Sequence, residues 1–308
     1  MEDEHTESSR RAVCVTGMHR SGTSFVTGAL RFLGVEMGDP AKMLRPGDDN
    51  PVGYFEIQAM IELDDELLAH LGGAWDAPPV LDPGWEASAD LDGFRARAGE
   101  LLDDVFGSAE ARPALVGWKD PRLAILLPFW RTVTPIETTI VMVRDPREVA
   151  ASLAARRYSV PSQQAAGLWL RYLLAAVVND SGHLLIRYDD AYERLEDTLA
   201  AIAHHVGVPR PDTTALTEAR RTLDPGLRHH RGSEAGSDSD NPLMETALTI
   251  WNEGTPALDR VPPAAVDALA RGWLAPPGDA ELLARSRADV IRCREALRQA
   301  NRRLESQT

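Results

Sequence analysis

Short apolar runs alternate with segments of helical periodicity over the first two thirds of the chain. Residues 11–17 (RAVCVTG) predict a buried strand, and residues 22–33 predict a helix that opens on glycine, threonine and serine. Residues 57–71 carry apolar side chains at near-helical spacing and predict a second helix. The first unit of the chain is therefore a strand, a loop and a helix.

The pattern continues with further alternation. Strands are predicted at residues 114–119, 138–144 and 183–188, and helices up to about residue 106 and at 121–133, 146–157, 162–178 and 191–206. Strands that alternate with helices predict a three-layer α/β fold, with a mostly parallel central sheet flanked by helices. The C-terminal part reads as helical, apart from a polar segment at residues 224–241 that is typical of a mobile loop.

Length and composition limit the domain organisation. With 308 residues and 44% apolar content, the chain is long enough to bury one large core. We expect one principal domain at residues 11–275, preceded by a disordered acidic tail at 1–10 and followed by a C-terminal helix at 276–308. Sparse apolar positions in residues 281–304 leave two interpretations open, a solvated helix or a weak coiled coil that forms a homo-oligomer.

Charge excludes some classes of partner. The formal net charge of −14 repels polyanions, so no nucleic-acid partner is expected and an anionic ligand must be captured by a local basic site. Cys14 and Cys293 form no spacing typical of a disulfide framework or a metal site, and Cys14 is expected in the core. No apolar run reaches roughly 18 residues and the N-terminus is acidic, which predicts a cytoplasmic protein without a membrane span.

Residues 17–24 (GMHRSGTS) carry the clearest chemical motif. Two glycines let the backbone curl around an anion, and the following helix N-terminus adds favourable partial charge. The motif matches a Walker A frame except that Thr23 stands at the lysine position, which argues against an ATPase or kinase. A basic side chain lies inside the loop instead, as Arg20. An ordinary glycine-containing turn is the less favoured alternative.

The same string resembles the 5'-phosphosulfate loop of sulfotransferases that use 3'-phosphoadenylyl sulfate (PAPS). The resemblance spans about residues 11–232 and implies a P-loop NTPase-like fold. It implies that Arg20 contacts the bridging or terminal oxygens of the donor. Four loop residues would hold the 5'-phosphate: Ser21, Gly22, Thr23 and Ser24. His19 either contacts the acceptor or packs at the loop.

A second motif begins at Arg144, at the end of a predicted strand. Asp145 suits a helix N-cap and Pro146 the first helical position, so a helix should begin there with Ser152 two turns further on. An arginine followed eight residues later by a serine resembles the family's 3'-phosphate site, in which a guanidinium fork and a hydroxyl grip the phosphate. Alone, the string is also typical of a plain strand-to-helix turn.

Residues 118–122 (WKDPR) end another predicted strand. A lysine at the carboxyl edge of a parallel strand faces the crevice where ligands of such sheets bind. The Lys-Asp-Pro string resembles one found in tyrosyl-protein and bacterial sulfotransferases, which implies that Lys119 stabilises the leaving phosphate. The alternative is a surface ion pair with Asp120. Arg122 either orients an acidic acceptor or is a solvated first-turn residue.

Glu56 is the candidate general base. Sulfuryl transfer to an alcohol or phenol benefits from a carboxylate that removes the acceptor proton, and related sulfotransferases often place a glutamate shortly after the first helix. Tyr54 and Phe55 flank Glu56 and would desolvate it in part. The alternative is that Glu56 caps the following helix.

A late basic segment at residues 227–231 (LRHHR) suggests a further phosphate contact from Arg228. Residues 72–85, rich in proline and glycine, predict either an ordered loop over the acceptor pocket or a surface excursion whose tryptophans, Trp75 and Trp85, fold back onto the core.

Together the resemblance implies transfer of a sulfuryl group from PAPS to a hydroxyl of a small-molecule acceptor, such as a phenol, natural product or sugar. The product is adenosine 3',5'-bisphosphate (PAP), and no metal is expected. Three alternatives stay open: a P-loop kinase-like phosphotransferase, a nucleotide-binding protein without turnover, and a sulfotransferase for glycans or peptides. The acceptor itself cannot be identified from the sequence.

Overall fold

The computed structural model describes residues 11–45, 47, 53–108, 113–155, 160–222 and 241–254. Its central sheet has four parallel strands in the order β2-β1-β3-β4. The strands are β1 Arg11–Gly17, β2 Leu115–Lys119, β3 Ile136–Val143 and β4 Leu184–Arg187. Because all four run the same way, their carboxyl ends meet at one edge of the sheet.

Helices follow the strands as the periodicity predicts. They are α1 Thr23–Phe32, α2 Gln58–His70, α3 Asp92–Phe106, α4 Leu123–Val133, α5 Pro146–Ala154, α6 Ser162–Asn179, α7 Tyr188–Glu193, α8 Leu195–Val206, α9 Thr213–Thr222 and α10 Pro242–Glu253, with short 3-10 turns at Pro40–Lys42, Trp85–Ala87 and Ala89–Leu91. The predicted fold class, a parallel sheet between helices, is confirmed. The N-terminal tail, the C-terminal helix and the predicted boundary between residues 275 and 276 lie outside the described residues.

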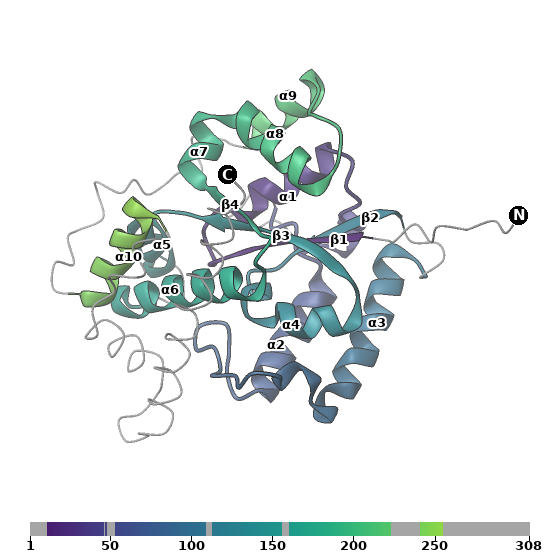
Figure 1. The fold of residues 1–308 in the computed structure, drawn as a ribbon, viewed down its shortest axis with the longest axis vertical. Helices are drawn as coiled ribbons and strands as arrows, with labels where there is room; N and C mark the ends of the chain where they lie inside the picture. Colours follow the sequence, from purple (N-terminus) through teal and green to yellow (C-terminus); the bar gives the residue numbers. More distant parts are fainter. Residues whose placement is uncertain are drawn as a thin grey trace, which may run out of the picture.

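Alternate strand residues face opposite layers of the molecule, as the period of two requires. Cys14, Trp118 and Val141 belong to a core shared with α2 to α6 and α10, which confirms Cys14 as a core residue. Val13 and Ile140 belong to a second core shared with α1, α8 and α9. Figure 1 shows the sheet between these two groups of helices. None of the helices in the described part of the chain is long and apolar enough to cross a bilayer.

One predicted helix differs from the structure. The segment at residues 191–206 is two helices, because the backbone leaves helical geometry at Arg194 with φ −126° and ψ 51°. β4 also ends at Arg187, one residue earlier than predicted, and α7 begins at once with Asp189 and Asp190 in its first turn, where acidic side chains favour a helix. The break lets Leu195 turn into the second core, a tertiary contact that local periodicity does not report.

Candidate anion-binding site at the carboxyl edge of the sheet

The loop after β1 has a backbone that only glycine fits at two positions. Gly17 has φ 139° and Gly22 has φ 89°. A Cβ at Gly17 would lie 2.3 Å from the backbone oxygen of Met142, and one at Gly22 would lie 2.4 Å from the ring of Tyr188. The loop is therefore pressed against the ends of β3 and β4, and its glycines are a steric requirement.

Ser21 supplies a buried hydroxyl inside this loop. The residue is fully buried, and its Oγ has no hydrogen-bond partner among the described residues. A buried hydroxyl without a partner costs about 1–3 kcal/mol, a cost that an oxygen of a bound anion would remove. α1 begins two residues later, and Gly22 offers its N-terminal amides no side-chain cap. These features fit a phosphate group at the loop.

The structure brings the first and second motifs together. Arg20 has a left-handed backbone with φ 72°, and its Nε donates a hydrogen bond to Ser152 Oγ at 2.9 Å. Arg144 Nη1 donates to the backbone oxygen of Arg20 at 3.4 Å. Residues from the loop after β1, from the position directly after β3 and from α5 therefore form one basic cluster at the edge of the sheet.

Arg144 is held in this cluster from two further sides. Its Nε donates to Glu148 Oε2 at 2.7 Å, and the Glu148 side chain is almost fully buried. The guanidinium carbon lies 4.7 Å from the centroid of the Tyr188 ring. Asp145 caps α5 by accepting from Arg147 N at 2.8 Å, as the sequence predicts. The fork of Arg144 is thus fixed before any ligand binds.

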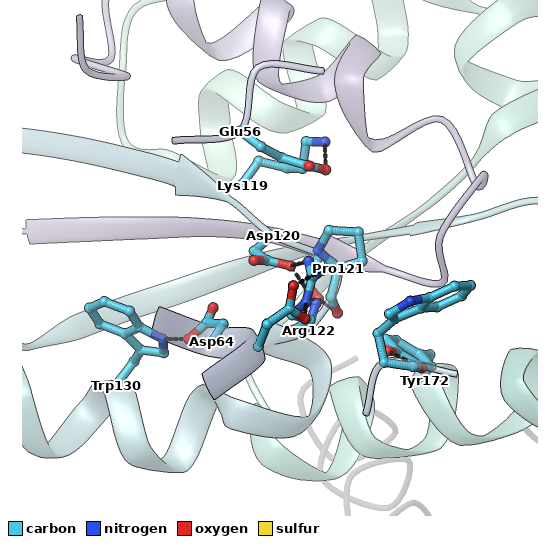
Figure 2. A network of polar contacts seen from close by, with 11 residues as sticks. Glu56, Asp64, Lys119, Asp120, Pro121, Arg122, Trp130 and Tyr172 are labelled. Carbon is cyan, nitrogen blue, oxygen red and sulfur yellow. Dashed lines mark hydrogen bonds and ion pairs between the residues drawn. The ribbon is translucent and has the colours of Figure 1, made fainter. Parts of the chain in front are cut away.

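Lys119 and Glu56 form an ion pair with a direct hydrogen bond (Figure 2). Only 2% of the Lys119 side chain and 12% of the Glu56 side chain are exposed. The alternative interpretation of Lys119, a surface ion pair with Asp120, is wrong, because Asp120 pairs with Arg122. The alternative interpretation of Glu56, a cap of α2, is also wrong, because the N-cap is Ile57 and no side chain caps the helix. The candidate base and the candidate leaving-group cation therefore lie side by side.

Ser24 takes part in placing the segment that leads to Glu56. Its Oγ donates to the backbone oxygen of Tyr54 at 3.3 Å, which ties α1 to this segment. Phe55 has a left-handed backbone with φ 54°, and the Glu56 carbonyl accepts from Leu44 N at 2.7 Å. This backbone directs the chain toward the end of β2, where Lys119 lies.

Arg122 is buried, so of its two interpretations the solvated first-turn residue is wrong. Its Nε and Nη2 donate to the two carboxylate oxygens of Asp65 at 2.6 and 3.0 Å, and its Nη1 donates to Asp120 Oδ1 at 3.0 Å. Burial alone would lower the pKa of Arg122, but the Asp120 and Asp65 carboxylates together outweigh burial and raise it. The guanidinium stays charged and engaged within the protein.

Asp64 is a buried acid that the sequence interpretation missed. It lies four positions from both Met60 and Leu68 on the apolar face of α2, and an acid at such a position is the signal that would have found it. Its Oδ1 accepts from Trp130 Nε1 at 2.8 Å. Burial, and secondly the charge of Asp120, raise the pKa of Asp64 well above its ordinary value.

His19 connects the loop after β1 to residues 72–85. Its ring centroid lies 4.7 Å from that of Trp75 and 5.6 Å from that of Tyr172. Tyr172 donates its hydroxyl to the Trp75 carbonyl at 2.7 Å, and burial raises the Tyr172 pKa so that the donor proton stays in place. The His19 ring therefore packs against the rings of Trp75 and Tyr172, and Trp75 brings this second loop to the edge of the site.

Residues 72–85 are anchored along α6. Gln164 Nε2 donates to the Asp76 carbonyl at 2.9 Å, and Arg171 Nη2 donates to the Pro79 carbonyl at 3.1 Å. The rings of Trp75 and Trp85 pack against the larger core, as one of the two interpretations expects. Arg228, the candidate late phosphate contact, lies outside the described residues.

By class, the chain is a parallel α/β protein with a candidate anion-binding site at the carboxyl edge of its sheet. No protein-family model matches the chain, and no curated protein matches it. Among solved structures it is similar to the sulfotransferase domain from the Synechococcus PCC 7002 olefin synthase, with 16% sequence identity and a TM-score of 0.40. That similarity covers 97% of this chain and 98% of the other.

Proposed function

We propose that this chain is a sulfotransferase that takes a sulfuryl group from PAPS and transfers it to a hydroxyl of a small-molecule acceptor. The observation that carries the proposal is the contact of Arg20 with Ser152 and Arg144. A donor with phosphates on both the 5' and the 3' position of its ribose needs two neighbouring cationic side chains, one for each phosphate. Guanidinium groups suit this task because their geometry matches phosphate oxygens.

The donor residues are assigned from their surroundings. The glycines, the buried Ser21 hydroxyl and the N-terminal amides of α1 suit the 5'-phosphosulfate. Arg144, held by Glu148 and stacked on Tyr188, suits the 3'-phosphate. Since the chain carries a net charge of −14, binding of such an anion depends on this local cluster.

The proposed reaction balances without a further reactant. The acceptor oxygen forms a bond to sulfur while the bond between sulfur and the bridging phosphate oxygen breaks, and that oxygen keeps the electron pair as PAP leaves. Glu56 takes the acceptor proton, and Lys119 offsets the charge that develops on the leaving phosphate. Their ion pair supports these roles. The base acts at the acceptor oxygen and the cation at the bridging phosphate oxygen, and both oxygens are bonded to the same sulfur during transfer.

The experiment is a calorimetric titration of the protein with PAP, alone and in the presence of ATP and Mg²⁺. We expect PAP to bind and excess ATP to displace it only weakly, because Thr23 stands where a triphosphate-binding loop has lysine. Binding of ATP with Mg²⁺ and none of PAP would instead support a kinase-like phosphotransferase.

Turnover separates the remaining alternatives. PAPS is supplied with panels of phenols, sugars, glycans and peptides, and PAP release is measured. Transfer to a phenol or simple sugar supports the proposed acceptor class, and transfer only to glycans or peptides replaces it. PAP binding without transfer to any acceptor supports a nucleotide-binding protein that does not turn over.

A further inference from the structure

Glu56 and Lys119 reach their ion pair from two separate segments. Glu56 lies just before α2, and Lys119 is the last residue of β2. We propose that Arg122 is a positioning residue that fixes α2 against the turn between β2 and α4, and so holds Glu56 at Lys119. This inference rests on the proposed function, because it assigns the ion pair a task in the transfer reaction.

The first step of the argument is the geometry of Arg122. It donates two parallel hydrogen bonds to the two oxygens of Asp65. A third hydrogen bond runs to Asp120 (Figure 2). Only 8% of the Arg122 side chain is exposed, and Asp120 is almost fully buried. A planar fork that binds a carboxylate at both oxygens fixes orientation as well as distance.

The second step is that the turn itself is fastened to the sheet. Asp120 Oδ1 accepts from Arg122 N at 2.8 Å, and Asp120 N donates to the Val15 carbonyl at 3.3 Å. Thr16 Oγ1 donates to the Pro121 carbonyl at 3.0 Å. Arg122 therefore joins α2 to a point that is already fixed to β1.

The third step is the stiffness of α2. Gln58 and Asp65 lie roughly 10 Å apart along α2. Because the helix is stiff over this length, fixing Asp65 also restrains the start of α2. The neighbouring Asp64 is bonded to Trp130 of α4, a second buried contact that also restrains rotation of α2. Together these two contacts fix the start of α2 relative to β2. They therefore also fix Glu56, which lies just before α2, relative to Lys119.

The test uses Asp65→Asn in the full chain. The side chain of Asp65 is 47% exposed, so the substitution weakens the fork without emptying the core, whereas Arg122→Ala would leave the buried Asp120 unpaired. The matched control is Glu66→Gln, because Glu66 lies next on α2 and its ion pair with Arg97, 2.7 Å long, is to α3 rather than to the turn.

The first measurement is hydrogen–deuterium exchange of the ligand-free variants. We expect backbone amides of residues 119–124 and of the start of α2 to exchange about fivefold faster in Asp65→Asn than in wild type. Glu66→Gln should match wild type there. Equal exchange rates of these amides in Asp65→Asn and Glu66→Gln would overturn the positioning role of Arg122, whatever the function of the protein.

The second measurement is the rate of PAP release from PAPS with an accepting phenol, in a double-mutant cycle with Glu56→Gln. We expect Asp65→Asn to lower this rate about fivefold in wild type and to have no further effect once the Glu56 carboxylate is absent. The same loss in both backgrounds would mean a general structural effect and would overturn the positioning role. Absence of PAP binding to the wild type would overturn the proposed function, and the positioning role with it.

Discussion

At the scale of single residues, Arg144 is assigned to the 3'-phosphate, which PAP carries and the 5'-monophosphate lacks. Arg144→Ala should therefore weaken PAP binding about thirtyfold and binding of the 5'-monophosphate less than threefold. The reason is that the substitution removes a charge-assisted hydrogen bond that only PAP can form. Calorimetric titration with both nucleotides measures the difference. Arg147→Ala is the control, since Arg147 lies in the same turn and pairs with Asp145. Equal weakening for the two nucleotides would remove the 3'-phosphate assignment.

Asp64 gives a residue-scale prediction about pH. An unfolded aspartate releases its proton near the ordinary pKa of 3.8, whereas burial raises the pKa of folded Asp64 well above it. Above pH 3.8 the folded state therefore binds more protons, and this residue's contribution to stability falls as pH rises toward its folded pKa. Asp64→Asn should lose that dependence.

In the Asp64→Asn variant, the side-chain amide oxygen can still accept from Trp130 Nε1. The amide nitrogen can donate to Asp120 Oδ2, which has no hydrogen-bond partner among the described residues. The variant should match the wild type near pH 4 and exceed its free energy of unfolding by about 1 kcal/mol at pH 8. Urea denaturation at a series of pH values measures this. A difference that stays constant with pH would show that Asp64 does not hold its proton.

At the scale of elements, α10 is joined to the edge strand by a stacked pair. The Arg187 guanidinium, at the end of β4, lies 3.9 Å from the centroid of the Trp251 ring on α10, and Trp251 belongs to the larger core. Trp251→Leu loses both the cation–π contact and part of the packing, so we expect a loss of about 3 kcal/mol in unfolding free energy.

Denaturation in urea gives the measurement, with Trp251→Phe as the graded control that keeps an aromatic face. The phenylalanine variant should fall between the leucine variant and the wild type. A leucine variant as stable as the wild type would mean that α10 is held by its contacts with α5 and α6 alone.

Elements were largely predictable because each strand and helix carries its own period. Residues 11–17 and 162–178 were placed to within one residue, since buried alternation and helical spacing are local properties. The break at Arg194 was missed, because it depends on where Leu195 is buried. The contact between His19 and Trp75 was open for the same reason, since neither segment specifies its neighbour.

At the scale of the whole molecule, the proposed reaction centre requires that Glu56 and Lys119 act together. Glu56→Gln should lower PAP release from PAPS in the presence of an accepting phenol more than 100-fold, because an amide cannot take the acceptor proton, and should change PAP affinity less than threefold. Glu62→Gln is the control, since Glu62 lies on the exposed side of α2 and accepts from Gln58. Wild-type turnover in Glu56→Gln would exclude Glu56 as the base.

The sequence by itself determined the order of strands and helices, the glycine loop and the placement of Arg144 and Lys119 at strand ends, because these follow from local periodicity and from residues adjacent in the chain. Only the tertiary structure decided the partners. Arg20 lies against Ser152, Lys119 against Glu56 and Arg122 against Asp65, across separations of 132, 63 and 57 residues. Charge and burial select such pairs once the sheet and helices pack, and no local pattern encodes that selection.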